Sequence, residues 1–320
     1  METIKLSIVI PVYNSEDCLL ELNTQVEQAL ANFPSYELIL VNDKSPDNSW
    51  GKIIEVCAKN KNAIGISLRK NSGQDNAIMA GLKIAKGEYI IIMDDDLQHS
   101  PDDILKLYNE CIKGYDICFG LFSGKKQKLW KNFGSWMNGK LSEKLISKPK
   151  EIYLSPFKIF RNEIAKEMIH YTGPYPYIDA LLLTITHNIS QIPIEHHTRY
   201  KGKSNFSMFR SMSVFLKHAT GYSVYPLRLA IYMGFISALL AFVFGAYFLI
   251  DYFFISGDKV EGWISTILLI LLLGGSILIC MGIIGEYVGR IFLTINKKPQ
   301  YTIEKITSKS ITNTHVITEE

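Results

Sequence analysis

Three consecutive aspartates, Asp94, Asp95 and Asp96, are the residues from which a function can first be argued. They follow the apolar run 89–93, which predicts a buried strand, so the carboxylates are expected at its C-terminal tip, where α/β sheets bind ligands. Asp94 and Asp96, with the amide oxygen of Gln98, supply hard oxygen donors suited to Mg²⁺ or Mn²⁺ bridged to a diphosphate. An isolated triplet would more simply be a solvated acidic turn that caps the next helix, so the surrounding sequence decides between the two.

Short apolar or β-branched runs alternate with helical stretches in the first part of the chain. The strand-like runs are 6–11, 37–41, 63–68 and 89–93, and the helical stretches are 18–31, 49–59, 76–85 and 102–113. This alternation predicts an α/β fold, with a Rossmann-like, mostly parallel sheet covered by helices on both faces. Parallel strands place their C-terminal ends at one edge, so the turns that follow them should lie near the aspartates.

Two later runs, 229–250 and 263–285, contain no charged residue, and each is as long as the roughly 20 residues of a transmembrane helix. A hairpin of buried core helices is the alternative. Arginines and lysines flank the pair on both sides, whereas the linker 251–262 carries Asp251, Asp258 and Glu261 with a single lysine, Lys259. The positive-inside rule therefore places both flanks in the cytoplasm. With no signal-peptide pattern at the start, we expect a multi-pass protein of the cytoplasmic membrane, with its catalytic domain and both termini in the cytoplasm.

The expected division of the chain follows from these runs. It comprises a soluble domain (1–203), an amphipathic juxtamembrane helix (204–226), two transmembrane helices (227–293) and a cytoplasmic tail (294–320). A core helix of the soluble domain is the alternative for the amphipathic segment. The Ser/Thr-rich end, 307–320, is expected to be disordered.

The net charge argues against a nucleic-acid-binding protein, and the cysteine content argues against a cysteine metal site or disulfides. A formal net charge of +3 is too small to indicate a nucleic-acid partner. The five cysteines lack the paired spacing of a metal site, and a reducing compartment argues against disulfides. The basic segment 124–131 is either a solvated loop or a contact for phosphate or anionic lipid, and the sequence leaves both open.

Five segments, in this order and spacing, resemble the motifs of glycosyltransferase family 2, in the polyprenyl-phosphate branch related to dolichyl-phosphate mannose synthases. They are SIVIPVYN (7–14), VNDKSPD (41–47), NSGQ (71–74), MDDDLQH (93–99) and RYKGKS (199–204). The resemblance runs from about residue 6 to residue 290. It implies a GT-A fold, with a nucleotide-diphosphate sugar bound at the C-terminal edge of the sheet.

The resemblance also implies roles for residues of the first four motifs. Pro11, Tyr13 and Asn14 would line the nucleotide, Asp43 would accept a hydrogen bond from its base, and Asn71 with Asp94 or Asp95 would hold the ribose. Taken singly, these segments are also ordinary turn sequences.

For the reacting groups, the resemblance implies a loop at 199–204 that closes over the diphosphate. Arg199 and Lys201, with the metal at Asp94, Asp96 and Gln98, would stabilise the leaving group. Attraction to anionic lipid is the alternative for this loop. Candidates to hold the acceptor phosphate are Lys125, Lys126, Lys128, Lys131 and Ser204. The segment 154–160 departs from the family pattern, and Asp179 could either reach the sugar or belong to a structural loop.

The expected reaction is the inverting, metal-dependent transfer of one sugar, from a UDP-sugar such as UDP-glucose, to undecaprenyl phosphate at the cytoplasmic face of the membrane. Mg²⁺ or Mn²⁺ is the expected cofactor, and the resemblance favours a homo-oligomer, a tetramer. Two alternatives stay open: a membrane-attached transferase with a glycan or protein acceptor, and a non-catalytic membrane protein that binds nucleotide sugars.

Overall fold

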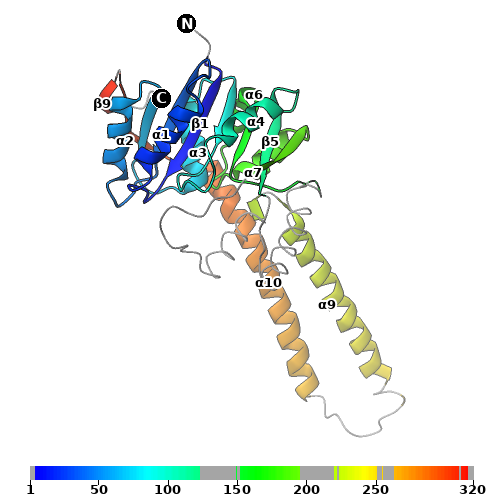
Figure 1. Ribbon diagram of the computed structural model, residues 1–320. Helices are drawn as coiled ribbons and strands as arrows, with labels where there is room; N and C mark the ends of the chain where they lie inside the picture. The colour runs from blue at the N-terminus through cyan, green and yellow to red at the C-terminus, as the bar shows by residue number, and fades with distance from the viewer. Residues whose placement is uncertain are drawn as a thin grey trace. The chain divides into compact units, whose positions relative to one another are not determined.

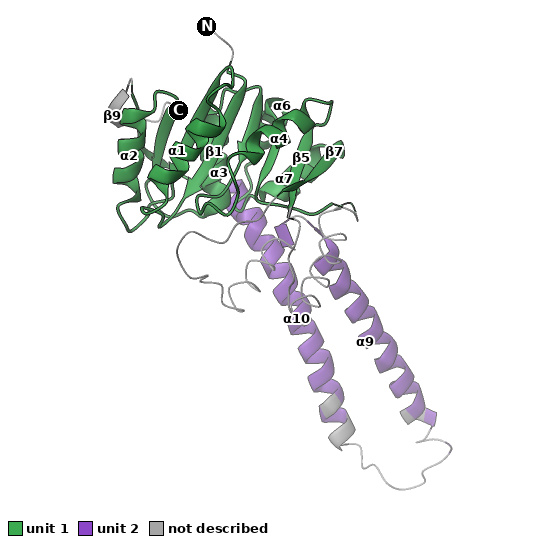
Figure 2. Ribbon diagram, in the orientation of Figure 1, with its two compact units in different colours: residues 1–208, 297–320 green, residues 209–296 purple. Residues whose placement is uncertain are grey.

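The computed structural model describes residues 4–122, 149, 152–194, 220–221, 223–250, 254, 263–309 and 311–315. The chain divides into two compact units (Figure 2): unit 1 comprises residues 1–208 and 297–320, and unit 2 comprises residues 209–296. Unit 1 is therefore assembled from both ends of the chain.

Unit 1 is built around a nine-stranded sheet of order β7-β5-β6-β4-β1-β2-β3-β8-β9 (Figure 1). Its strands are β1 (Leu6–Val12), β2 (Tyr36–Asn42), β3 (Ala63–Leu68), β4 (Tyr89–Ile92), β5 (Ile117–Phe122), β6 (Lys158–Arg161), β7 (Ile189–Ile194), β8 (Ile303–Ser308) and β9 (Ile311–His315). The central strands β4, β1, β2 and β3 run parallel, whereas β6 and β8 pair antiparallel on either side of them. The predicted α/β fold with a mostly parallel centre is confirmed.

Helices cover both faces of the central strands, which explains why every residue of β1 is buried. The helices that the structure describes in unit 1 are α1 (Leu19–Ala29), α2 (Ser49–Lys59), α3 (Gln74–Ile84), α4 (Asp103–Cys111), α6 (Asn162–Met168) and α7 (Ile178–Ile185). Apolar residues of α1, α2 and α4 share one core with Ile8 and Leu40. On the other face α3 approaches β1 so closely that a Cβ at Gly81 would lie 2.4 Å from a Val9 methyl carbon.

The end of the chain forms strands, so the disorder expected for 307–320 is wrong in the part that the structure describes. β8 pairs antiparallel with β3, with Ile306 opposite Ile66, and β9 pairs with β8. Thr307 is buried. The Ser/Thr-rich composition was misleading because isoleucine and threonine are good strand residues once an open sheet edge supplies backbone partners.

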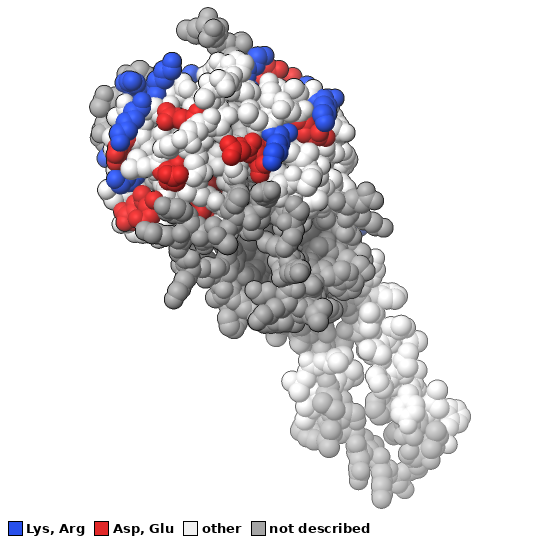
Figure 3. Space-filling view, in the orientation of Figure 1, with Lys and Arg blue, Asp and Glu red and all other residues white. Residues whose placement is uncertain are grey.

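Unit 2 contains two long helices, α9 (Tyr225–Ile250) and α10 (Trp263–Ile295), and both are long and apolar enough to cross a membrane. On the face shown in Figure 3, charged side chains gather on unit 1, and the described surface of α9 and α10 carries almost none. Within unit 2, the Tyr287 hydroxyl donates to the Ser223 carbonyl (2.5 Å), and the Ser237 and Ser276 hydroxyls lie 3.3 Å apart. Most of the predicted amphipathic helix, 204–226, lies outside the described residues.

The turn from α3 to β4, which sets the position of the aspartates, depends on close approach at Gly87. A Cβ there would lie 2.4 Å from the backbone nitrogen of Ser7. The Gly87 amide donates to the Ser7 hydroxyl (2.7 Å), which in turn donates to the buried carboxylate of Glu37.

We expect Gly87→Ala to destabilise the protein by about 1–3 kcal/mol, because the added methyl group meets backbone that cannot move aside as a side chain would. Thermal unfolding of the purified protein measures the effect. Lys86→Ala, at an exposed residue one position earlier, is the control and should unfold within a degree or two of the unchanged protein. Equal unfolding temperatures for the two variants would contradict this account of the turn.

Candidate active site

The turns after β1, β2 and β4 meet at one edge of the sheet, because these strands are adjacent and parallel. Asp95, after β4, accepts hydrogen bonds from the Tyr13 amide (3.2 Å) and from the Ser15 hydroxyl, both in the turn after β1. The Asn14 amide donates to the Ser45 hydroxyl (3.2 Å) in the turn after β2. The motifs at 7–14, 41–47 and 93–99 therefore converge, and the Tyr13 ring is left half exposed at this edge.

Each of these turns holds one residue with left-handed backbone: Asn14 (φ 60°), Lys44 (φ 54°) and Leu97 (φ 57°). This conformation is unfavourable for residues other than glycine, and most of all for a bulky residue such as leucine. Such strain persists where the surrounding hydrogen bonds fix the backbone, and it concentrates at functional sites. The edge is thus held in a defined shape before any ligand binds.

Asp43, which is predicted to accept a hydrogen bond from the nucleotide base, is only 3% exposed. Its carboxylate binds the backbone of a neighbouring turn. Its two oxygens accept hydrogen bonds from the amides of Ser72 (2.6 Å) and Gly73 (2.8 Å). Burial raises the pKa of Asp43, and the two amides oppose that rise. Asp43 therefore fixes the turn that carries Asn71 and starts α3, a role that sequence reasoning missed. Each oxygen keeps a further lone pair with which to accept a base N–H.

Asp94, Asp95 and Asp96 crowd negative charge into a partly buried place. Burial, followed by the charges of Asp96 and Asp95, raises the pKa of Asp94 to about 7, and burial raises the pKa of Asp95 to about 6. The Gln74 side-chain amide donates a hydrogen bond to Asp94 (2.8 Å), and the Gln98 backbone amide donates one to Asp96 (3.1 Å). In the absence of a cation, burial and mutual repulsion therefore favour the protonated form of Asp94 and Asp95, and a bound cation would favour their ionised form.

The donor set of these residues fits Mg²⁺ or Mn²⁺ as part of a shared site. No group of three histidine, cysteine or acidic side chains in the described residues is arranged to hold a metal ion by itself. Mg²⁺ usually takes one or two protein carboxylates, completing its shell with water and substrate phosphates. Asp94 and Asp96, with Gln98 next to them in the same turn, can supply that protein share.

A buried lysine beside the aspartates was not predicted. Lys158, on β6, forms an ion pair with Asp179, and the two side chains are only 5% and 13% exposed. Its ammonium lies 5.6 Å from the Phe119 ring centroid, and its charge lowers the pKa of Asp94. The signal was present in the sequence, since a single lysine within the apolar run 157–160 needs a buried acidic partner.

Asp75, in the first turn of α3, is a further acidic residue that sequence reasoning missed. Its pKa is raised to about 6, chiefly by burial and then by the charge of Asp179, while Lys158 opposes the rise. Lys158 is therefore a fixed positive charge shared by three carboxylates: Asp75, Asp94 and Asp179.

Several predicted site residues lie outside the described residues: Arg199, Lys201, Ser204, Lys125, Lys126, Lys128 and Lys131.

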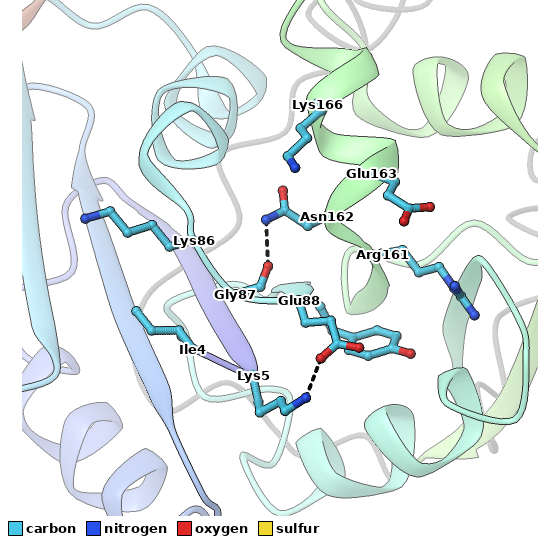
Figure 4. A pocket seen from close by; sticks show the side chains of 10 residues that line it. Ile4, Lys5, Lys86, Gly87, Glu88, Arg161, Asn162, Glu163 and Lys166 are labelled. Atoms are coloured by element: carbon cyan, nitrogen blue, oxygen red, sulfur yellow. Dashed lines mark hydrogen bonds and ion pairs between the residues drawn. The ribbon is translucent and has the colours of Figure 1, made fainter. Parts of the chain in front are cut away.

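A cavity of about 470 Å³ lies at the other edge of the sheet, where β1 and β4 begin (Figure 4). Lys5 and Glu88, which line it, form an ion pair (2.6 Å). None of the predicted site residues lines this cavity, so the acidic edge remains the candidate active site.

Two family models match the sequence. "Glycosyl transferase family 2" matches residues 7–170, which include the three turns, and "GtrB C-terminal hairpin" matches residues 225–291, which include α9 and most of α10.

Curated relatives match almost the whole chain. The undecaprenyl-phosphate 4-deoxy-4-formamido-L-arabinose transferase of Klebsiella pneumoniae (strain 342) is 30% identical over 305 residues, which are 94% of this chain and 93% of that protein. The protein of the same name from Yersinia pestis (strain Pestoides F) is 30% identical over 306 residues, with the same coverage.

Solved structures share the fold of unit 1. Glucosyl-3-phosphoglycerate synthase from Mycobacterium tuberculosis, in complex with Mn²⁺, UDP and phosphoglyceric acid, has a TM-score of 0.53 at 15% identity, covering 68% of this chain and 76% of that one. Its complex with Mn²⁺, UDP and glucosyl-3-phosphoglycerate has a TM-score of 0.52. At this identity the likeness shows the fold alone, and it agrees with the expected GT-A fold.

The buried pair Lys158–Asp179 gives a prediction about stability. We expect Lys158→Met to destabilise the protein by about 3–5 kcal/mol, because Asp179 would keep its buried charge and lose its partner. Lys158→Met combined with Asp179→Leu should recover much of the loss, since no unpaired charge then remains. Thermal unfolding of the two single variants and the double variant measures the coupling. Additive losses would show that the two side chains do not stabilise each other.

Proposed function

The chain belongs to glycosyltransferase family 2, and from this membership we propose that it transfers a single sugar from a nucleotide-diphosphate sugar to a polyprenyl phosphate. One observation carries the proposal: relatives named as undecaprenyl-phosphate sugar transferases match 94% of this chain, and so both the acidic sheet edge and the apolar hairpin. A polar site and two apolar helices in one chain suit a water-soluble donor and a lipid acceptor.

The donor is proposed to be a UDP-sugar, with UDP-glucose as one candidate. The structures of the mycobacterial synthase that resemble unit 1 hold UDP together with Mn²⁺. In this chain the Tyr13 ring is exposed enough to stack on a base, and Asp43 keeps acceptor capacity for a base N–H. We assign the ribose to Asn71, which is also exposed, and to Asp95.

The acceptor needs little activation in this reaction. A phosphate monoester has a second pKa near 6, so at neutral pH it is already mostly an anionic nucleophile. The greater demand is on the departing nucleotide diphosphate, whose developing charge a metal ion at Asp94 and Asp96 would neutralise when bound. We assign Arg199 and Lys201 to the same charge, and a single displacement would invert the anomeric carbon.

The membrane topology that we propose is multi-pass, with both ends of the hairpin in the cytoplasm. The chain leaves unit 1 before α9 and returns after α10 to add β8 to the same sheet. If the two helices span a membrane, both of their unit 1 connections must be on one side of it. The basic flanks indicate that this side is cytoplasmic.

The function is tested by incubating the purified protein with undecaprenyl phosphate and a panel of radiolabelled nucleotide sugars. We expect label from one UDP-sugar to enter an organic-extractable lipid, and mild acid to release it. Label that appears in protein or glycan would indicate a different acceptor. Binding of a nucleotide sugar without transfer to any acceptor would indicate a non-catalytic protein.

The metal assignment is tested by Asp96→Asn. The change keeps the shape of the side chain and removes one charge from the proposed metal site, so we expect turnover to fall roughly 100-fold or more. Asp102→Asn is a matched control, because Asp102 is an exposed aspartate in the next turn, and its activity should be near normal. Activities are compared across a Mn²⁺ titration after metal removal. An unchanged Mn²⁺ response in Asp96→Asn would exclude Asp96 as a ligand.

A further inference from the structure

Residues 300–304, here called the C-terminal strap, comprise the end of the connection from α10 and the first two residues of β8. Sequence reasoning gave them no role beyond a cytoplasmic tail. They belong to unit 1, and their described contacts reach three turns at the edge of the sheet that carries the aspartates.

The first contact is with the turn that leads into α7. The Gln300 side-chain amide donates to the carbonyls of Tyr171 (2.9 Å) and Gly173 (2.7 Å). That turn ends at Ile178, where α7 begins, and Asp179 in the first helical turn is the partner of Lys158. The Gln300 side chain therefore fixes the turn that precedes Asp179, one partner of the buried ion pair with Lys158.

The second group of contacts is with the turns after β2 and β3. Glu304 pairs with Lys44 (2.8 Å), which follows Asp43 directly and has left-handed backbone. The Thr302 carbonyl accepts a hydrogen bond from the Arg69 amide (2.8 Å), just before Asn71. These are the turns to which the base and ribose of the donor are assigned.

We propose that the C-terminal strap positions the donor site by fixing the turn before α7 relative to the turns after β2 and β3. This inference rests on the proposed function, because it deepens the account of how the donor is held. Ligand-binding turns must be placed within a fraction of an ångström, and their supporting hydrogen bonds decide whether they are. Because only residues 296–299 separate the strap from the end of α10, donor binding is tied to the chain segment that leaves the apolar hairpin.

The contacts of the C-terminal strap are expected to affect the positions of the turns more than the global stability of the protein. Gln300 makes neutral hydrogen bonds to carbonyls, and the Lys44 and Glu304 side chains are 49% and 25% exposed. Exposed ion pairs and single neutral hydrogen bonds contribute little to global stability. Variants of the strap should therefore separate donor binding from stability.

The main test is Gln300→Met, which keeps the length of the side chain and removes its amide donor. We expect the KM for the donor sugar nucleotide to rise about five- to thirtyfold, the cost of losing two hydrogen bonds. The turnover number and the KM for polyprenyl phosphate should change less than about threefold, and the unfolding temperature should stay within about 3 °C. Gln28→Met, the same change at an exposed position of α1, is the matched control and should leave all four quantities unchanged.

Two results would overturn the proposal. An unchanged donor KM in Gln300→Met would show that the strap does not position the site. Equal increases in both KM values, with a large fall in unfolding temperature, would show a structural role only. Transfer by the unchanged protein in the same assay reports on the proposed function separately.

A measurement without substrate keeps the inference testable if no transfer is detected. Amide hydrogen exchange of the full-length protein should become faster at residues 171–177 in Gln300→Met, while β1 and β4 stay protected. Unchanged exchange in that turn would contradict the proposed contact.

The ion pair is tested by exchanging its charges. Lys44→Glu and Glu304→Lys should each raise the donor KM about two- to fivefold, because each places like charges together. The double variant should recover most of the loss if the attraction between these two side chains positions the turn. A double variant no better than the singles would show that the pair plays no part.

Discussion

The balance of charge at the C-terminal edge of the sheet is the constraint on which the other features of the site depend. Asp94, Asp75 and Asp179 surround one buried lysine, Lys158, in a place where burial already disfavours charge. Lys158 is paired with Asp179, and the pKa values of Asp94 and Asp75 stay raised beside it, so a cation at this edge would favour the ionised form of these two carboxylates. This effect supports the proposed binding of a divalent ion together with the diphosphate of a nucleotide sugar.

The backbone is fixed around this charge by hydrogen bonds between turns. Asp43 holds the turn after β3, Asp95 holds the turn after β1, and Gln74 connects the start of α3 to Asp94. Aspartates thus serve both as carriers of charge and as acceptors for backbone amides. Leu97, despite its left-handed backbone, is buried in the apolar core shared by α1, α2 and α4, and the next backbone amide, of Gln98, donates to Asp96, so packing and a hydrogen bond together fix this turn.

The sequence allowed the parallel core to be predicted because each central strand is a continuous apolar run, and a strand buried on both faces has no polar alternation to obscure it. The position of Asp94 at a strand tip followed from the same runs. The pairing of Lys158 with Asp179 could not be predicted, since it depends on how β6 and α7 meet. The strand at 303–308 was missed for a related reason. Its partner, β3, lies more than 200 residues earlier in the chain, and composition carries no information about such a pairing.

The pairing of β8 with β3 shows that the globular unit does not end at residue 203. A division at residue 203 treats the first part as a complete soluble domain and the rest as an anchor. Yet β8 covers the edge of β3, and Glu304 pairs with Lys44 across 260 positions of sequence. A chain cut after residue 203 would lose the apolar hairpin and also expose an unpaired edge on β3. It would release the turns beside Asp43 and Asp179 as well. A loss of activity after such a cut therefore cannot be assigned to the missing membrane helices, and the separate role of the hairpin must be tested with the strap and β8 in place.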